Sequence, residues 1–155
     1  MKTNFKFAIA AGLLAVSISA GFAFAAMTAD EAIKQRKLCM KSGHGGVFAI
    51  AVPIVKGERH FDADALKAAY DNEDKQCANY DALFAVDTQQ GTTEKTAALP
   101  AIWTDPEGFK AAGAAWYAAS QKLRAATDDA SFKAAFPAVG ASCKGCHEKF
   151  RAATP

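Results

Sequence analysis

The chain has 155 residues, with 18 Lys and Arg against 16 Asp and Glu and a formal net charge of +2. The first 26 residues hold two of the lysines and no acidic residue, so the remainder is formally neutral. That balance argues against a nucleic-acid-binding protein, which needs an excess of basic residues to neutralise phosphates. The remainder, about 130 residues, has the length of one domain with a single core.

The N-terminal segment has the pattern of a secretory signal peptide. Lys2 and Lys6 precede an apolar run, and Ala23-Phe24-Ala25 supplies the small-x-small pattern of a cleavage site. We therefore expect residues 1–26 to be removed on export and residues 27–155 to form the mature domain. A membrane anchor is the alternative, because the apolar stretch approaches the ~20 residues that span a bilayer. The cleavage pattern favours removal, and we expect no membrane-spanning segment in the mature chain.

In the mature region apolar residues recur at spacings of three and four, which indicates helices rather than strands. The first helix is predicted to begin near Thr28, where Thr28 and Glu31 form a capping box, and to pass through Met40. Glycines at positions 43, 45 and 46 weaken its middle, since each costs about 1 kcal/mol relative to alanine. The apolar stretch 47–55 is expected to resume the helix until Gly57.

A second helix is predicted from Asp62 or Asp64. Its inward face carries apolar residues at steps of four and three, the pattern of a helix bundle. The face reads Leu66, Tyr70, Glu73, Cys77, Tyr80 and Phe84. Glu73 is its only charged member, and the sequence gives no reason for it. A polar loop is predicted over 87–96.

Two further helices complete the chain. The third is expected to open at Thr104-Asp105-Pro106-Glu107, where a cap, an early proline and a glutamate coincide. The fourth is expected after residues 128–129 and to reach Phe150, with a late start or a kink caused by Pro137. Four helices with short connections predict an all-α fold, an antiparallel four-helix bundle.

The fourth predicted helix carries a Cys-x-x-Cys-His motif at Cys143, Cys146 and His147. Residues three apart share a helix face, so both thiols can reach one porphyrin edge and form thioethers. His147 follows directly and can reach the iron, for which histidine is the usual proximal ligand. A thioredoxin-like dithiol would need a βαβ context, and a zinc site a second ligand pair at suitable spacing. The sequence offers neither.

The position of this motif, near the C-terminus on the last helix of an exported bundle, resembles the class II c-type cytochromes, the cytochrome c' family with its low-spin relatives. Most cytochromes c carry the motif near the N-terminus. Three further stretches are similar to the family's pattern. They are Arg36-x-x-x-Met40, residues 55–62 at the first interhelix turn, and Pro100-Ala101-Ile102-Trp103 before the third helix.

The resemblance implies one haem c, bound covalently through Cys143 and Cys146, with iron ligated by His147. It implies that Arg36 lies beside the haem propionates, where a permanently charged guanidinium is suitable. Met40 would line the distal side, as the sixth ligand in low-spin members and without binding iron in five-coordinate ones. We favour ligation, because His/Met is an established electron-transfer pair.

Two other features of the sequence bear on the distal side of the haem. His44 lies one turn beyond Met40 and is a rival for the sixth position, since imidazole binds iron well. Tyr80 or Phe84 could narrow the distal pocket and decide which gases fit.

The remaining cysteines, Cys39 and Cys77, are expected at similar levels of antiparallel helices if the first turn is centred near Arg59. A disulfide between the first two helices is one outcome, and two buried free thiols are the other.

We therefore expect a periplasmic electron carrier rather than an enzyme, with redox proteins as partners and a homodimer as one assembly. The alternative is a five-coordinate haem protein that binds nitric oxide or carbon monoxide. A small dithiol oxidoreductase is the third hypothesis.

Overall fold

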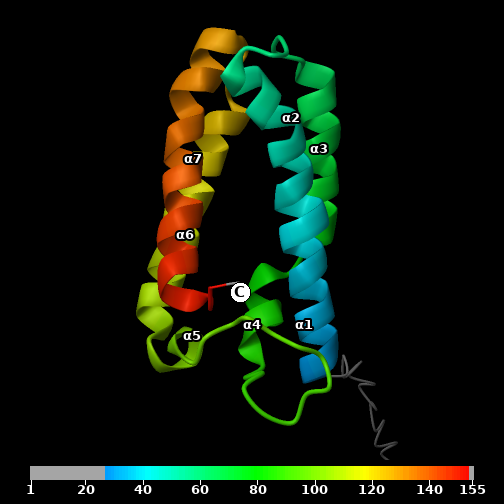
Figure 1. The fold of residues 1–155 in the computed structure, drawn as a ribbon, viewed down its shortest axis with the longest axis vertical. Helices are drawn as coiled ribbons and strands as arrows, with labels where there is room; N and C mark the ends of the chain where they lie inside the picture. The colour runs from blue at the N-terminus through cyan, green and yellow to red at the C-terminus, as the bar shows by residue number, and fades with distance from the viewer. Residues whose placement is uncertain (1–26, 154–155) are drawn as a thin grey trace, which may run out of the picture.

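The computed structural model describes residues 27–153, so the predicted signal peptide lies outside the described residues. Within this range the chain forms eight helical segments and no strand (Figure 1). Their bounds are α1 Ala29–Leu38, the π-helix η1 Cys39–His44, α2 Gly45–Lys56, α3 Ala63–Gln76, α4 Tyr80–Ala85, α5 Ala101–Thr104, α6 Pro106–Arg124 and α7 Asp129–Phe150. The predicted all-α bundle is confirmed.

The segments α1, η1 and α2 follow one another without a break and form one long helix. The predicted capping box is present, with Thr28 accepting from the Glu31 backbone and Glu31 accepting from that of Thr28. The low helix propensity of the glycines predicted a weak point here, but they do not interrupt the helix. The chain instead widens into a π-helix. Gly43 is buried, and a Cβ added to it would lie 2.8 Å from the Cys77 sulfur, so glycine allows α3 to approach closely.

The long helix over 29–56 has the length and apolar composition that a membrane span requires, and a helix at the core of a bundle has them too. Ala51 and Ile54 are fully buried in the core shared by α2, α3, α6 and α7. The apolar residues of α2 are thus used in packing against the other helices.

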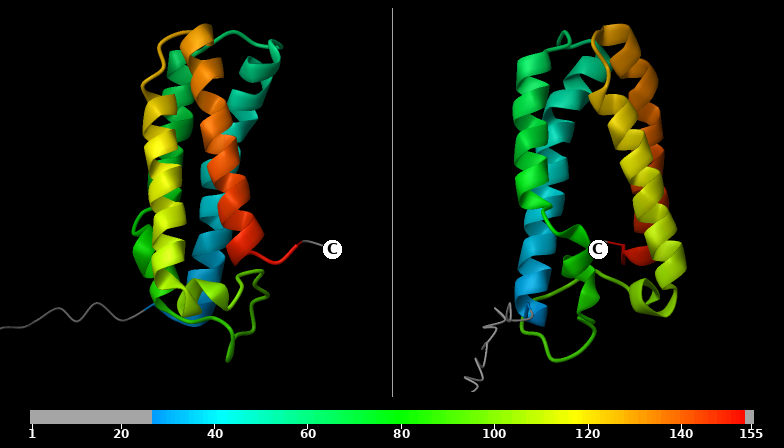
Figure 2. Two further views of the ribbon diagram at one scale, coloured as in Figure 1. Left: turned by 90° about the vertical axis from the view of Figure 1, so that its left-hand side faces the viewer. Right: turned by 180° about the vertical axis from the view of Figure 1, so that it is seen from behind.

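The second predicted helix is shorter than expected, so its predicted length is wrong. It begins as expected at the cap Asp62 but ends at Gln76, because Asn79 adopts a left-handed conformation with φ of 57°. Asparagine tolerates this conformation better than most residues. Tyr80 and Phe84 consequently lie on the short helix α4, which turns away from α3 (Figure 2).

The predicted starts of the last two long helices are confirmed. Asp105 accepts from the Gly108 backbone with Pro106 at the first helical position, and Asp128 forms a capping box with Ser131. Of the two effects expected of Pro137, the late start is wrong, since α7 runs from Asp129 through the proline, and the kink stays a prediction. Pro137 is exposed, so water can bind the carbonyl that loses its partner.

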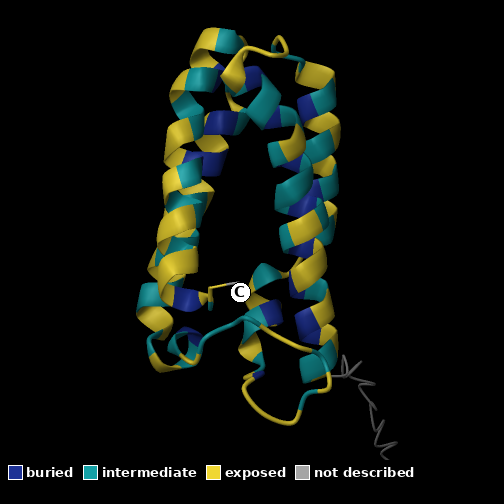
Figure 3. Cartoon of the chain, in the orientation of Figure 1, coloured by how far each residue is buried: buried dark blue, intermediate teal, exposed yellow. Residues whose placement is uncertain are grey.

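The bundle consists of two helix pairs that meet at one end and diverge at the other. The segments α1, η1 and α2 pair with α3, and α6 pairs with α7 (Figures 1 and 2). The hydrophobic core lies where the pairs meet. Buried residues are found there and also at the opposite end, on α1, α4, α5 and the last turn of α7 (Figure 3). The buried members of the core are Ala51, Ile54, Leu66, Ala119, Leu123, Phe132 and Val139. This closed end holds the pairs together and leaves the diverging half available for a site.

Asp128 provides a test of how acid acts on the fold. Bonds from Ser131, first from its backbone, hold the pKa of the Asp128 carboxyl below its ordinary value. Because the pKa of this carboxyl is lower in the folded chain than in the unfolded chain, where it is about 4, the ionised carboxylate stabilises the fold. This stabilisation is complete above pH values near the unfolded pKa and is lost as the pH falls through the folded pKa. We expect Asp128→Asn, which still caps a helix but does not titrate, to lose less stability between pH 5 and pH 3 than the wild type. Urea midpoints at the two pH values measure this, and identical losses would contradict it.

Candidate haem site

A cavity of about 320 Å³ lies in the diverging half, between the two helix pairs. Five segments contribute to its wall: η1, α2, α4, α6 and α7. The lining residues are Met40, His44, Gly45, Phe48, Tyr80, Ala112, Gly113, Trp116, Ser142, Cys143, Cys146 and His147. The structure therefore brings together the predicted haem motif, the predicted Met40 and the rival His44.

One wall is the last turns of α7. Cys143 and Cys146 are three residues apart on this helix, and both are half-buried along the cavity with His147. Burial raises the pKa of both thiols, and the neighbouring Cys146 adds to the effect on Cys143. Burial, and then the charge of Arg151, lower the pKa of His147. The imidazole is thereby favoured in its neutral form, the form in which histidine ligates metals.

The opposite wall is formed by the π-helix. Met40 and His44 both line the cavity, four residues apart in η1, and Trp116 of α6 meets the His44 ring edge-on at 4.7 Å between centroids. A thioether and an imidazole therefore lie across the cavity from the Cys-x-x-Cys-His motif.

The residues present fit a covalent haem. The volume lies within the range of sites for cofactors and drug-sized ligands, about 300–1,000 Å³. The lining is largely apolar, with Phe48, Tyr80 and Trp116 as its aromatic members, and such surroundings exclude water from a porphyrin. Two thiols on one helix face and an adjacent imidazole supply the covalent anchors and an axial ligand.

Arg36 does not line this cavity. Its guanidinium is buried and donates from Nε to the Leu83 carbonyl at 2.6 Å and from NH1 to the Thr88 hydroxyl at 2.9 Å. A third bond runs from NH2 to the Val86 carbonyl, and the group lies over the Phe84 ring. Arg36 thus ties α4 and the following loop to α1. Its predicted contact with haem propionates stays a prediction.

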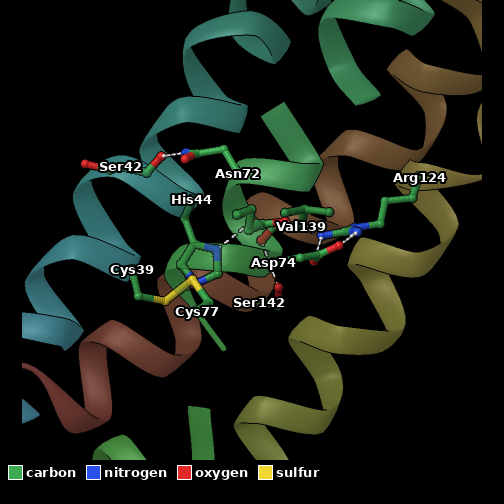
Figure 4. Close-up of polar contacts among 10 residues, drawn as sticks. Cys39, Ser42, His44, Asn72, Asp74, Cys77, Arg124, Val139 and Ser142 are labelled. Carbon is green, nitrogen blue, oxygen red and sulfur yellow. Dashed lines mark hydrogen bonds and ion pairs between the residues drawn. A yellow bond between two sulfur atoms is a disulfide. The ribbon is translucent and has the colours of Figure 1, made fainter. Parts of the chain in front are cut away.

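Cys39 and Cys77 are joined by a disulfide that links η1 to α3, one of the two outcomes left open by the sequence (Figure 4). His44 lies against this disulfide, with Nε2 3.6 Å from the Cys39 sulfur and 3.9 Å from that of Cys77. Its Nδ1 lies 2.6 Å from a carboxylate oxygen of Glu73, which is 4% exposed. The buried charge on the inward face of α3 is therefore explained as a partner for His44.

Arg124 of α6 completes this polar network. Its NH2 lies 2.6 Å from Glu73 and 2.6 Å from the exposed Asp74, so it joins α6 to α3 (Figure 4). Hydrogen bonds, first to Asp74 and then to Glu73, raise the pKa of Arg124. The bonds of the network pass from the wall of the cavity to the surface.

Sequence reasoning missed several residues of the cavity wall. The sequence pattern indicates only that Phe48 belongs to an apolar stretch, and it carries no signal for Ala112. The expectation that Tyr80 borders the pocket is confirmed, whereas Phe84 is not among the lining residues. Ser142 was also missed, but it could have been found from helical spacing alone, because it precedes the predicted haem anchor Cys146 by four residues.

Comparison with known proteins places the chain in a family. Residues 31–151 match the family described as Cytochrome C'. A cytochrome c' of Alcaligenes xylosoxydans xylosoxydans is 35% identical over 127 residues, which cover 79% of this chain and 94% of the relative. A cytochrome c-556 of Agrobacterium tumefaciens (strain II Chrys) is 32% identical over 121 residues, 77% of this chain and 95% of the relative.

Among solved structures, the nitric oxide complex of a variant of cytochrome c prime from Alcaligenes xylosoxidans has a TM-score of 0.68 and 32% identity, and the match covers 81% of this chain and 98% of that one. The fold, the cavity with its Cys-x-x-Cys-His motif and these matches agree. The chain belongs to the cytochrome c' family of class II c-type cytochromes, which bind covalent haem c.

Proposed function

We propose that this protein is a periplasmic one-electron carrier, with a haem joined to Cys143 and Cys146 and ligated by His147 and Met40. The observation that supports this most directly is the cavity, which has His147 on one wall and Met40 on the other. Met40 would supply a thioether to the iron beside the imidazole of His147, and a His/Met pair would favour electron transfer over the binding of a gas.

The chain's own residues position and insulate the cofactor. When bound, the haem supplies an Fe(III)/Fe(II) couple. Cys143 and Cys146 of α7 would hold the cofactor through two thioethers, and the apolar side chains of Phe48 and Trp116 in the cavity wall would exclude water from it. Arg36 has five N–H donors, of which three are used in the bonds to α4 and its loop, so two remain for a propionate. Redox proteins of the periplasm are the proposed partners of this protein.

A five-coordinate gas-binding protein is the second candidate. The specific observation in its favour is the relative of 32% identity whose structure is a nitric oxide complex. In that case Met40 would line the distal pocket without reaching the iron, and His147 would be the sole axial ligand.

Met40→Ala separates the two functions. Loss of a ligating thioether is expected to convert a low-spin absorption spectrum to a high-spin one and to raise the affinity for carbon monoxide by at least about tenfold, since a distal site opens. Met27→Ala is the matched control, because Met27 precedes α1 and does not line the cavity. Absorbance spectra and carbon monoxide titrations of the purified holoproteins provide the measurement.

The five-coordinate function predicts a different result. A wild-type protein that is already high-spin and binds carbon monoxide readily, with a spectrum unchanged by Met40→Ala, would contradict methionine ligation. The same result would support the gas-binding candidate.

A further inference from the structure

Outside the haem motif, the described residues bring three potential metal ligands together. The sulfurs of Cys39 and Cys77 and a ring nitrogen of His44 all lie within 4.8 Å of one another. Cys39 is fully buried, and the other two are half-buried. The proximity of Cys39 and Cys77 is predictable from the sequence, whereas the approach of His44 to both of them is not.

The π-helix makes the cluster possible. Cys39 and His44 are five residues apart and form the two ends of η1. In an α-helix residues five apart point about 140° away from each other. The wider i→i+5 turn of a π-helix brings them toward the same side, and such bulges occur frequently at functional sites. Gly43 adds to this by leaving room for the Cys77 sulfur of α3.

His44 is oriented as a metal-binding histidine. A carboxylate only accepts hydrogen bonds, so Nδ1 carries the hydrogen that is donated to Glu73 at 2.6 Å. In the neutral ring the lone pair then lies on Nε2, which faces both sulfurs (Figure 4). Histidines that bind metals commonly donate their other N–H to a carboxylate in this way. Arg124 holds Glu73 from the far side.

We propose that the reduced form of this cluster binds one thiophilic divalent cation, Zn²⁺, through Cys39, Cys77 and His44. A dithiol reductant transfers two electrons and two protons to the disulfide, giving two thiols and the cyclic disulfide of the reductant. Binding of Zn²⁺ then releases the two thiol protons as the thiolates coordinate. Water or a small anion completes a tetrahedral shell, as at zinc sites with two cysteines and one histidine.

The distances from His44 already suit zinc. With Zn–S bonds of about 2.3 Å and a Zn–N bond of about 2.0–2.1 Å, neighbouring ligand atoms of a tetrahedron lie about 3.5–3.8 Å apart. The observed separations from Nε2 are 3.6 and 3.9 Å. Once the S–S bond is broken, only the two sulfurs must move apart, and no backbone element has to cross the bundle.

A second cavity gives access from outside. It has a volume of about 210 Å³, lies between α3 and α6, and is lined by Cys77 together with Glu73, Arg124 and the exposed Tyr117. This opening is distinct from the haem cavity, although Tyr80 and Trp116 border both. A small dithiol and a cation can thus approach Cys77 without entering the haem site. The proposal requires that His44 is not the sixth iron ligand, and it holds whether or not Met40 binds the iron.

The test uses holoprotein, in which only Cys39 and Cys77 can become free thiols. The protein is treated with dithiothreitol, passed through an anaerobic desalting column and equilibrated with Zn²⁺. Zinc retained against a competing chelator is counted by native mass spectrometry, and alkylation counts the thiols. We expect one zinc per reduced chain and none in the unreduced protein. In His44→Gln the zinc affinity should fall at least about tenfold, whereas His60→Gln, at an exposed histidine, should leave it unchanged.

Three results would overturn the proposal. They are failure of the reductant to release two alkylatable thiols from the folded holoprotein, absence of zinc from the reduced wild type, and equal zinc affinities in His44→Gln and His60→Gln. The variant with both Cys39→Ser and Cys77→Ser should retain no zinc, and retention by that variant would place the metal elsewhere.

Discussion

Replacement of both Cys143 and Cys146 with alanine is expected to abolish covalent haem, so that the denatured chain no longer carries the cofactor's mass. Each thioether needs its own sulfur, and the described residues place no other free thiol along this cavity. Cys146→Ala alone should leave one thioether and an unsaturated vinyl group, which shifts the absorption of the pyridine complex of the haem to longer wavelength. Intact-protein mass spectrometry under denaturing conditions measures the first effect and pyridine spectra the second.

The chain supplies a matched control for this pair of substitutions. Changing Cys39 and Cys77 to serine removes the same number of sulfur atoms from the bundle, but these residues form the disulfide between η1 and α3. Covalent haem should persist in that variant. If the mass of the cofactor survives in the Cys143→Ala, Cys146→Ala protein, the proposed attachment is wrong.

The haem motif could be predicted from sequence because it is a local pattern. Three residues on two adjacent turns carry the signal, and their mutual position follows from helical geometry alone. The caps at Thr28, Asp105 and Asp128 were predictable for the same reason, since each accepts a bond from a backbone group three residues away. The similar height of Cys39 and Cys77 in the bundle could also be predicted, by counting residues on either side of the first interhelix turn.

The features that escaped prediction depend on contacts between distant segments. The π-helix at Cys39–His44 has no propensity signal, and it coincides with the close approach of α3 to Gly43. The end of α3 depends on one left-handed residue, Asn79, in a stretch whose apolar spacing continued to favour a helix. Glu73 could not be interpreted because its partners, His44 and Arg124, come from two other helices.

These long-range features are concentrated between the closed end and the cavity. The apolar core joins the helix pairs at one end, and the cavity separates them at the other. The polar network of His44, Glu73 and Arg124 lies beside the cavity and links three elements, η1, α3 and α6. The network therefore connects η1 and α3 to α6 of the other helix pair, at a level of the bundle where apolar packing no longer connects the two pairs.

Glu73→Ala is accordingly expected to be strongly destabilising, by about 3–5 kcal/mol. Removal of the Glu73 carboxylate leaves His44 and Arg124 without their buried partner. The free-energy cost of these unpaired polar groups is larger than the stabilisation that the intact pair provides. Asp74→Ala is the matched control, because Asp74 lies 2.6 Å from the same guanidinium group but its side chain is 62% exposed, against 5% for Glu73. Water screens the exposed pair, so its loss should cost less than about 1 kcal/mol.

The comparison is informative because the bond to Asp74 is the larger cause of the raised pKa of Arg124. An exposed carboxylate can shift the pKa of Arg124 without stabilising the fold to the same degree. Water solvates both charged groups when the chain unfolds, and it solvates the guanidinium group when Asp74 is replaced. Urea unfolding of the two holoproteins, followed by far-UV circular dichroism, measures both losses. Similar losses would show that Glu73 acts only as one of two carboxylates on Arg124. A much larger loss for Glu73→Ala would show that its burial and its bond to His44 carry the stabilisation.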